Sequence, residues 1–185
     1  PHDRDSMIYA DGSGAAILEA SHINGHGILS HKTQTHATVH AHLLRMDASY
    51  SGFTEDSNDR FLKMNGRKVY EFALTNVPVV VKAAIERAGL HLRDIDKVLI
   101  HQANDKMDQA ILNRLFELFE EQTIPPSIMP MTIGWLGNSS VATVPTLLDL
   151  LLKGKLDGHN IQDGDHVVMA SVGAGMNINA IVYRF

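Results

Sequence analysis

The chain has 185 residues, of which 44% are hydrophobic, and its formal net charge at pH 7 is −5. This length suits one large domain or two small ones, and the apolar fraction is sufficient for a core, which argues against disorder. The mildly acidic balance, without any basic run interleaved with aromatic residues, argues against a nucleic-acid partner. The sequence contains no cysteine, which excludes disulfides, thiolate metal sites and a cysteine nucleophile within these residues.

The first residues carry no membrane or export signal. No stretch of the sequence approaches the roughly 18 consecutive apolar residues that a membrane span needs. The start, PHDRDSMIYA, lacks the basic and apolar regions of a signal peptide. We therefore expect a cytoplasmic protein without a membrane partner. The first methionine is Met7, which is compatible with a start inside a longer gene product.

The predicted elements begin with two short strands, residues 7–10 and 14–21, separated by the glycines of DGSG. The next segment, residues 23–65, is less regular. Residues 27–44 can supply strands, and residues 47–59 are expected to form an exposed loop.

Histidines are concentrated in this irregular segment. Three of them, His36, His40 and His42, would share one face of a strand. No carboxylate motif accompanies them, and isolated surface histidines are common. We therefore expect no metal site, with a metal ion on that strand face as the alternative.

Apolar residues at helical spacing predict a helix over residues 67–90, which Pro78 should kink or divide in two. The apolar run at residues 98–100 predicts a buried strand. A second helix is expected over residues 105–121.

The last third of the chain is predicted to contain a third helix, residues 139–153, and two closing strands, residues 166–172 and 176–185. The whole order of helices and strands indicates an α/β fold in which helices pack on a mixed sheet.

The first candidate site follows the strand that ends at Ile100. His101, Gln102 and Asn104 occupy a strand-to-helix junction, and ligands collect outside the carboxyl ends of strands in such sheets. A neutral imidazole can donate one hydrogen bond and accept another, so it can polarise a carbonyl or pass a proton. In the alternative interpretation Asn104 caps the helix and His101 is a partly buried, satisfied histidine.

The second candidate is the motif GWLGNSS, residues 134–140, in which Asn138 precedes a helix. If Asn138 faces His101, the two side chains offer converging N–H donors to one oxygen, as in an oxyanion hole. The alternative is a tight turn followed by a helix cap.

The third candidate is the motif SVGAGMN, in which Gly173 and Gly175 bracket Ala174 between two predicted strands. Glycines let the backbone approach a ligand and direct an N–H at a developing negative charge. The alternative is a plain hairpin turn. The spacing does not fit a phosphate-binding loop.

Six stretches, in order, resemble the carboxyl-terminal half of β-ketoacyl-acyl-carrier-protein synthase III, a thiolase-fold condensing enzyme. They are DGSGAAIL, MNGRKVYEFA, HQAN, LGNSS, GAG and the terminal IVYRF. The resemblance implies a thiolase-like α/β fold with helices packed on a mixed sheet. It also implies that residues 1–22 are the last strands of an amino-terminal half and that residues 23–185 form the carboxyl-terminal domain.

The implied activity is decarboxylative Claisen condensation of an acyl thioester with malonyl-acyl carrier protein in fatty acid biosynthesis. In this family a cysteine of the first half takes the acyl group. His101 and Asn138 match the histidine and asparagine that assist decarboxylation. The turn at residues 173–175 resembles the one that supplies an oxyanion-hole N–H, with Ala174 where many members have glycine.

The resemblance extends to substrates and partners. Asn104 and Gly66 match substrate contacts, and Lys106 matches a basic position that docks the carrier protein. The implied partners are acyl carrier protein, acyl-coenzyme A and a second copy in a homodimer. No metal or cofactor is implied, because coenzyme A or phosphopantetheine thioesters serve as substrates.

The resemblance leaves the nucleophile unaccounted for. We expect the chain to be the carboxyl-terminal part of a longer synthase, whose missing amino-terminal half carries the cysteine, so that the chain alone is inactive. The alternatives are a subunit paired with a cysteine-bearing chain, a noncatalytic homologue, or an acyltransferase or ketosynthase of specialised metabolism.

Overall fold

The computed structural model describes residues 3–52 and 58–185. Its strands are β1 (Gly27–Thr35), β2 (Leu44–Asp47), β3 (Phe61–Met64), β4 (Lys97–Ile100), β5 (His166–Gly173) and β6 (Asn177–Arg184). The main sheet has the order β1-β6-β5-β4, while β2 and β3 form a separate antiparallel pair. Since β6 is antiparallel to both of its neighbours and β4 is parallel to β5, the sheet is mixed, as the sequence predicted.

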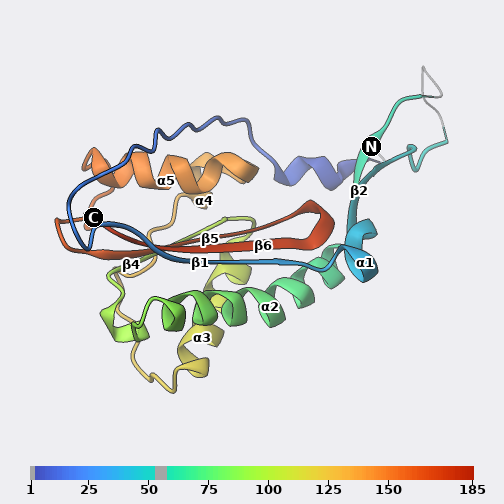
Figure 1. The fold of residues 1–185 in the computed structure, drawn as a ribbon. Coiled ribbons are helices and arrows are strands. Elements are labelled where there is room, and N and C mark those ends of the chain that lie inside the picture. Colours follow the sequence, from blue (N-terminus) through green and yellow to red (C-terminus); the bar gives the residue numbers. More distant parts are fainter. Residues whose placement is uncertain (1–2, 53–57) are drawn as a thin grey trace.

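Helices cover both faces of the main sheet (Figure 1). One face carries α2 (Gly66–Arg87) and α3 (Asp105–Leu118), and the other carries α5 (Thr143–Leu152) with the short α4 (Ile133–Leu136). The remaining helical turns are α1 (Ala37–His40), η1 (Arg4–Ile8), η2 (Ala41–Leu43), η3 (Leu92–Asp94), η4 (Ser140–Ala142) and η5 (Ala174–Met176). Among the described residues, no helix combines the length and the apolar character that a membrane crossing requires.

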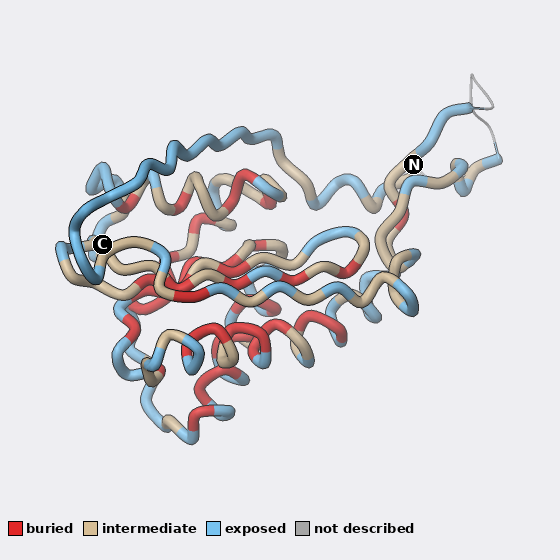
Figure 2. Tube along the Cα trace, viewed as in Figure 1, coloured by how far each residue is buried: buried red, intermediate tan, exposed pale blue. Residues whose placement is uncertain are grey.

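Two hydrophobic clusters hold these layers together, and their buried stretches are red in Figure 2. The larger cluster joins the sheet to α2 and α3. The smaller one, Leu99, Leu147, Leu151 and Val167, joins β4 and β5 to α5. Every residue of β4 is buried, because the strand is covered on both faces, and this explains its run of consecutive apolar residues.

The predicted long helix is present as α2, and it continues through Pro78 without a break. Proline removes one intrahelical hydrogen bond, but Pro78 belongs to the buried face of α2, together with Val77 and Val80. Tertiary packing of this face therefore maintains the helix. The predicted third helix begins at Thr143 rather than at residue 139, because residues 140–142 form the tighter turn η4.

The prediction that three histidines share a strand face is wrong. Residues 37–40 are helical, so β1 ends before His40. The rings of His36 and His40 instead meet the edge or face of Phe72, with centroid distances of 5.0 and 5.5 Å. In the described ranges, no three histidine, aspartate or glutamate side chains are grouped closely enough to hold a metal ion. Part of the predicted loop at 47–59, residues 53–57, lies outside the described residues.

The two predicted amino-terminal strands are also wrong. Residues 4–8 form η1, and residues 11–22 have neither helix nor strand structure and are exposed. A strand needs a partner for its backbone hydrogen bonds. Among the described residues of this segment, pairing with another strand-like segment is limited to one bridge between Tyr9 and Asn138, where the N–H of Ala10 donates to the Asn138 carbonyl at 2.8 Å. The assignment of residues 1–22 to a separate half stays a prediction.

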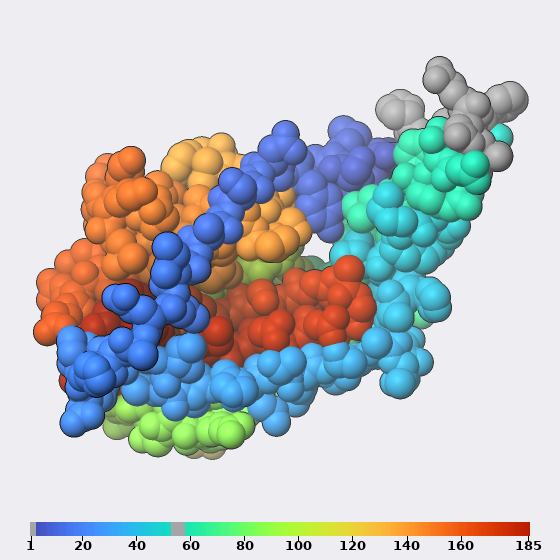
Figure 3. All heavy atoms as spheres, turned by 45° about the horizontal axis from the view of Figure 1, so that its top comes forward, coloured from blue at the N-terminus to red at the C-terminus, as the bar shows by residue number. Residues whose placement is uncertain are grey.

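The amino-terminal segment nevertheless has defined contacts at Asp3 and at Gly14. The buried ammonium group of Lys63 and the hydroxyl group of Ser49 donate to Asp3, and they lower the pKa of this carboxyl group to about 2. Further along, the segment crosses α5, as the blue spheres of Figure 3 show. Gly14 packs so closely there that a Cβ atom would lie 2.4 Å from Cγ of Pro145, which leaves no room for a side chain.

Candidate functional site

The end of β4 places His101 against the neighbouring strand. Its backbone N–H donates to the carbonyl of Ala170 in β5 at 2.9 Å. Three residues later Asn104 begins α3, and its Oδ1 accepts the backbone N–H of Met107 at 3.3 Å. Asn104 therefore caps the helix, which was the structural alternative for this residue.

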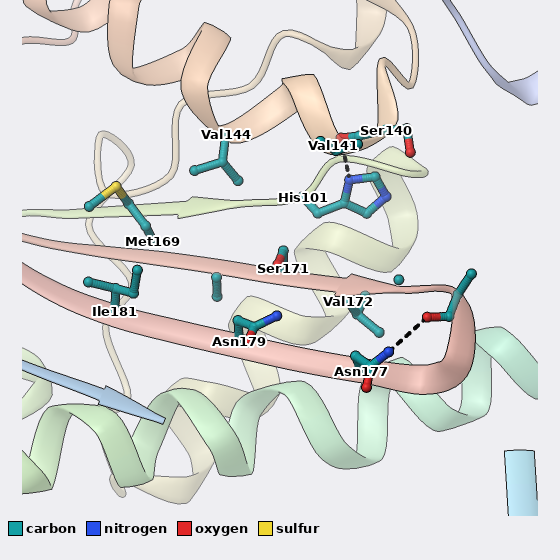
Figure 4. A pocket seen from close by; sticks show the side chains of 13 residues that line it. His101, Ser140, Val141, Val144, Met169, Ser171, Val172, Asn177, Asn179 and Ile181 are labelled. Atoms are coloured by element: carbon teal, nitrogen blue, oxygen red, sulfur yellow. Dashed lines mark hydrogen bonds between the residues drawn. The ribbon is translucent and has the colours of Figure 1, made fainter. Parts of the chain in front are cut away.

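The His101 ring is held by one hydrogen bond that fixes its tautomer. Nδ1 lies 3.1 Å from the carbonyl oxygen of Ser140 (Figure 4). A carbonyl oxygen can only accept, so Nδ1 carries the hydrogen and Nε2 of the neutral ring is an acceptor. Burial lowers the pKa of His101, and the bond to Ser140 only partly opposes this effect. Two converging N–H donors would therefore require a protonated ring, which burial disfavours.

Asn138 is buried, with 1% of its surface exposed. Its Oδ1 accepts the backbone N–H of Ser140 at 2.9 Å. Its Nδ2 group is a donor, and none of the hydrogen bonds found between described residues involves it. Ser140 thus contacts both candidate residues, through its N–H and through its carbonyl group. Its φ of 53° lies in the left-handed region, which non-glycine residues rarely adopt, and the two hydrogen bonds account for this strained conformation.

His101 and Asn138 line one small cavity of about 50 Å³ together with Gly173. Apolar side chains from β3, α2 and α3 close this cavity, among them those of Met64 and Met107. His101 also lines larger hollows of about 520 and 350 Å³. The 520 Å³ hollow lies between α5 and strands β5 and β6, with His101 at one end (Figure 4). His101 thus borders three hollows.

The turn after β5 faces the same space. Ala174 and Gly173 line both larger hollows. Gly175 has a φ of 75°, and a Cβ atom there would lie 2.8 Å from Nδ2 of Asn177, so a side chain at this position would strain the turn. The turn is also closed by Asn177, whose Nδ2 donates to the carbonyl of Ala174 at 3.0 Å. This geometry holds the backbone of residue 174 beside His101.

The other predicted site residues lie outside these hollows. Gly66 starts α2, and Asn104 and Lys106 lie at the start of α3, all three exposed. None of them lines the three hollows next to His101 in the described structure.

The sequence analysis missed the complete burial of two polar residues near the site. Gln102 is completely buried, although the motif suggested that it faces a substrate. Asp108 in the first turn of α3 is also completely buried, and neither of its carboxylate oxygens has a hydrogen-bond partner among the described residues. The helical spacing could have revealed Asp108, because it precedes the buried Ile111 and Leu112 by three and four positions. No comparable signal marks Gln102.

The tautomer of His101 gives a direct spectroscopic prediction. Above pH 7, long-range nitrogen–proton NMR spectra should show a neutral ring with its hydrogen on Nδ1. The ring should become protonated with a midpoint below the usual 6.5, because burial lowers its pKa. A hydrogen on Nε2, or a midpoint above 6.5, would contradict the geometry.

Residues 85–185 match the family model described as 3-oxoacyl-[acyl-carrier-protein (ACP)] synthase III C terminal. The β-ketoacyl-[acyl-carrier-protein] synthase III of Porphyra umbilicalis is 35% identical over 190 residues, covering 99% of this chain and 54% of the relative. That of Thermosynechococcus vestitus is 31% identical, covering 98% of this chain and 53% of the relative.

Solved structures of synthase III enzymes also match the fold of this chain. The 3-oxoacyl-(acyl carrier protein) synthase III of Pseudomonas aeruginosa matches with a TM-score of 0.73 at 23% identity, over 91% of this chain and 47% of that one. The enzyme of the same kind from Thermus thermophilus matches with a TM-score of 0.70 at 29% identity, over 88% and 47%. The chain therefore spans about half the length of the curated relatives and solved structures that it matches.

Proposed function

Because the chain belongs to the 3-oxoacyl-acyl-carrier-protein synthase III family, we propose that it supplies the decarboxylating part of a condensing enzyme's active site. The reaction joins an acyl thioester to malonyl-acyl carrier protein in fatty acid biosynthesis. One observation carries this proposal: Asn138 and His101 line one cavity and are both held by the backbone of Ser140.

The chemistry explains the need for these two side chains. When a malonyl thioester loses carbon dioxide, it leaves an enolate whose charge develops on the thioester oxygen. Nδ2 of Asn138 donates to this oxygen, a contact of the kind that contributes roughly 3 kcal/mol elsewhere. His101 adds a second donor at Nε2 once its ring is protonated, and the negative malonyl carboxylate favours that protonation when the substrate arrives.

The condensation step consumes a proton, and this gives the imidazole of His101 a second role as a proton donor. Attack of the enolate on the acyl-cysteine forms the new carbon–carbon bond and releases a thiolate, so each turnover takes up one proton. We assign that proton to Nε2 of His101, which passes it to the thiolate sulfur and becomes neutral again. The hydrogen bond from Nδ1 to Ser140 persists throughout this transfer.

The assignments of the remaining site residues follow the family resemblance. We assign to Ala174 a backbone N–H of the oxyanion hole, and to Asn104 and Gly66 contacts to the pantetheine arm of coenzyme A or of a carrier protein. Lys106 is exposed next to Asn104, where its positive charge suits an acidic carrier protein. Homodimer formation and a cytoplasmic location stay predictions.

The nucleophile belongs to residues outside this sequence, which contains no cysteine. A longer gene product, or a partner chain, supplies the cysteine that carries the acyl group. A related acyltransferase or ketosynthase of specialised metabolism would use the same cysteine with a different acceptor, and a noncatalytic homologue would use none.

A product assay distinguishes these possibilities. The intact gene product, with any partner chain that purifies with it, is incubated with acyl-coenzyme A and malonyl-acyl carrier protein, and the products are identified by mass spectrometry. We expect a 3-oxoacyl-acyl carrier protein and one equivalent of carbon dioxide. Transfer of the acyl group to a hydroxyl acceptor without carbon dioxide release would favour the acyltransferase, and no turnover of any donor would favour the noncatalytic homologue.

A further inference from the structure

Gln102 connects the two segments that carry His101 and Asn138. Its side chain is completely buried. Nε2 donates to the carbonyl of Pro130 at 2.8 Å, and Oε1 accepts the backbone N–H groups of Thr132 and Ile133 at 2.8 and 3.0 Å. The hydroxyl group of Thr132 also approaches Oε1, at 3.3 Å. One amide group thus satisfies four polar groups of a segment 30 residues away in the chain.

The segment held by Gln102 leads directly to Asn138. Thr132 precedes α4, and α4 ends two residues before Asn138. On the other side, Gln102 follows His101 in the chain, and the backbone of His101 is fixed to β5. The buried Gln102 amide group therefore links the segment of His101 to the segment of Asn138 through hydrogen bonds. The bond between the His101 ring and the carbonyl of Ser140 is the second link.

We propose that Gln102 is a positioning residue of the reaction: it sets the separation of His101 from Asn138 and does not itself touch the substrate. An amide suits this task because it offers a donor and an oxygen that accepts several hydrogen bonds within one planar group. Removing it would leave buried backbone groups of residues 130–133 without partners. The loop would then shift to find new ones, and displacements of about 1 Å can lower a rate by about 10²-fold.

The test compares two variants of the intact gene product. Its kinetic measurements rest on the proposed function. Gln102→Leu removes every hydrogen bond, and Gln102→Glu keeps the acceptor for Thr132 and Ile133 but loses the donor to Pro130. We expect kcat for malonyl decarboxylation to fall at least tenfold in Gln102→Leu, with KM changed less than threefold, and to fall less in Gln102→Glu. Acylation of the cysteine should stay at the wild-type rate, which also reports that the protein is folded.

A control variant separates positioning from general destabilisation. Leu115→Ala removes apolar volume from the larger hydrophobic cluster and changes no residue of the segments that carry His101 and Asn138. It should lower the melting temperature as much as Gln102→Leu while keeping the wild-type kcat for decarboxylation. An equal loss of kcat in both variants, or a wild-type kcat in Gln102→Leu, would overturn the proposal.

An NMR titration of His101 tests the positioning role of Gln102 independently of the activity. If the loop shifts away in Gln102→Leu, the His101 ring loses burial and the bond to Ser140, so its titration midpoint should rise toward the usual value, since burial is the larger influence on its pKa. An unchanged midpoint in a folded variant would contradict the positioning role. If the wild-type protein shows no decarboxylation but the midpoint moves, the proposed function fails while Gln102 still positions the pair.

Discussion

Asn138→Ala and His101→Ala should each lower carbon dioxide release from a malonyl thioester by about 10²-fold or more in the intact gene product. Under the proposed function, each substitution removes a group that stabilises the enolate, and the loss of one such donor has effects of this size in other enzymes. The rate is measured with malonyl thioester labelled at the free carboxyl group. Formation of the acyl-cysteine involves no enolate, so it should continue at a rate close to that of the wild type.

Asn113→Ala is the matched control, because Asn113 is an exposed asparagine on α3, outside the three hollows next to His101. It should leave both steps unchanged. Wild-type decarboxylation in the Asn138→Ala protein would remove this residue from the site, and an equal loss of acylation and decarboxylation in that variant would indicate a folding defect.

Asp108→Asn should stabilise the folded protein at neutral and alkaline pH. Burial raises the pKa of Asp108 from its usual 3.8 to about 7, and the nearby Asp105 contributes to the rise. The backbone N–H groups of Ala103 and Asn104 lie near enough to oppose it in part, although neither makes a well-aligned hydrogen bond to the carboxylate. A raised pKa in the folded state means that stability is lost as the pH rises from about 4 to about 7. At 1.36 kcal/mol per pKa unit, the full effect above pH 7 is at most about 4 kcal/mol.

Urea unfolding at pH 4.5 and pH 8 measures this difference. The advantage of Asp108→Asn should be small at pH 4.5 and reach its full size at pH 8. Asp157→Asn replaces an exposed aspartate and should change stability by less than about 0.5 kcal/mol at either pH. An Asp108→Asn protein less stable than the wild type at pH 8 would mean that the carboxylate makes a favourable contact and that the burial argument is wrong.

Local sequence patterns were sufficient for most of the fold. The buried strand β4, the helices α2 and α3 and the two closing strands β5 and β6 were each predicted from nearby residues, and all are confirmed. The family resemblance is also confirmed by the match at residues 85–185. The thiolase-like half fold is confirmed by the solved synthase III structures.

Features that depend on distant partners could not be predicted in this way. The strands expected before residue 22 need a neighbouring strand, which the described chain does not provide beyond the bridge at Tyr9. Gln102 reads as a site residue until its partners at residues 130–133 are known. The left-handed conformation of Ser140, which fixes the His101 tautomer, has no signal in the sequence.

The most direct test of the account is to locate the acyl group on the protein. The intact gene product, with any partner chain, is incubated with radiolabelled acyl-coenzyme A, digested and mapped by mass spectrometry. We predict that the label lies on a cysteine outside these 185 residues, because this sequence contains no cysteine and, under the proposed function, supplies the groups for decarboxylation. Stable acylation of a serine, histidine or lysine within this sequence would contradict that division of the active site.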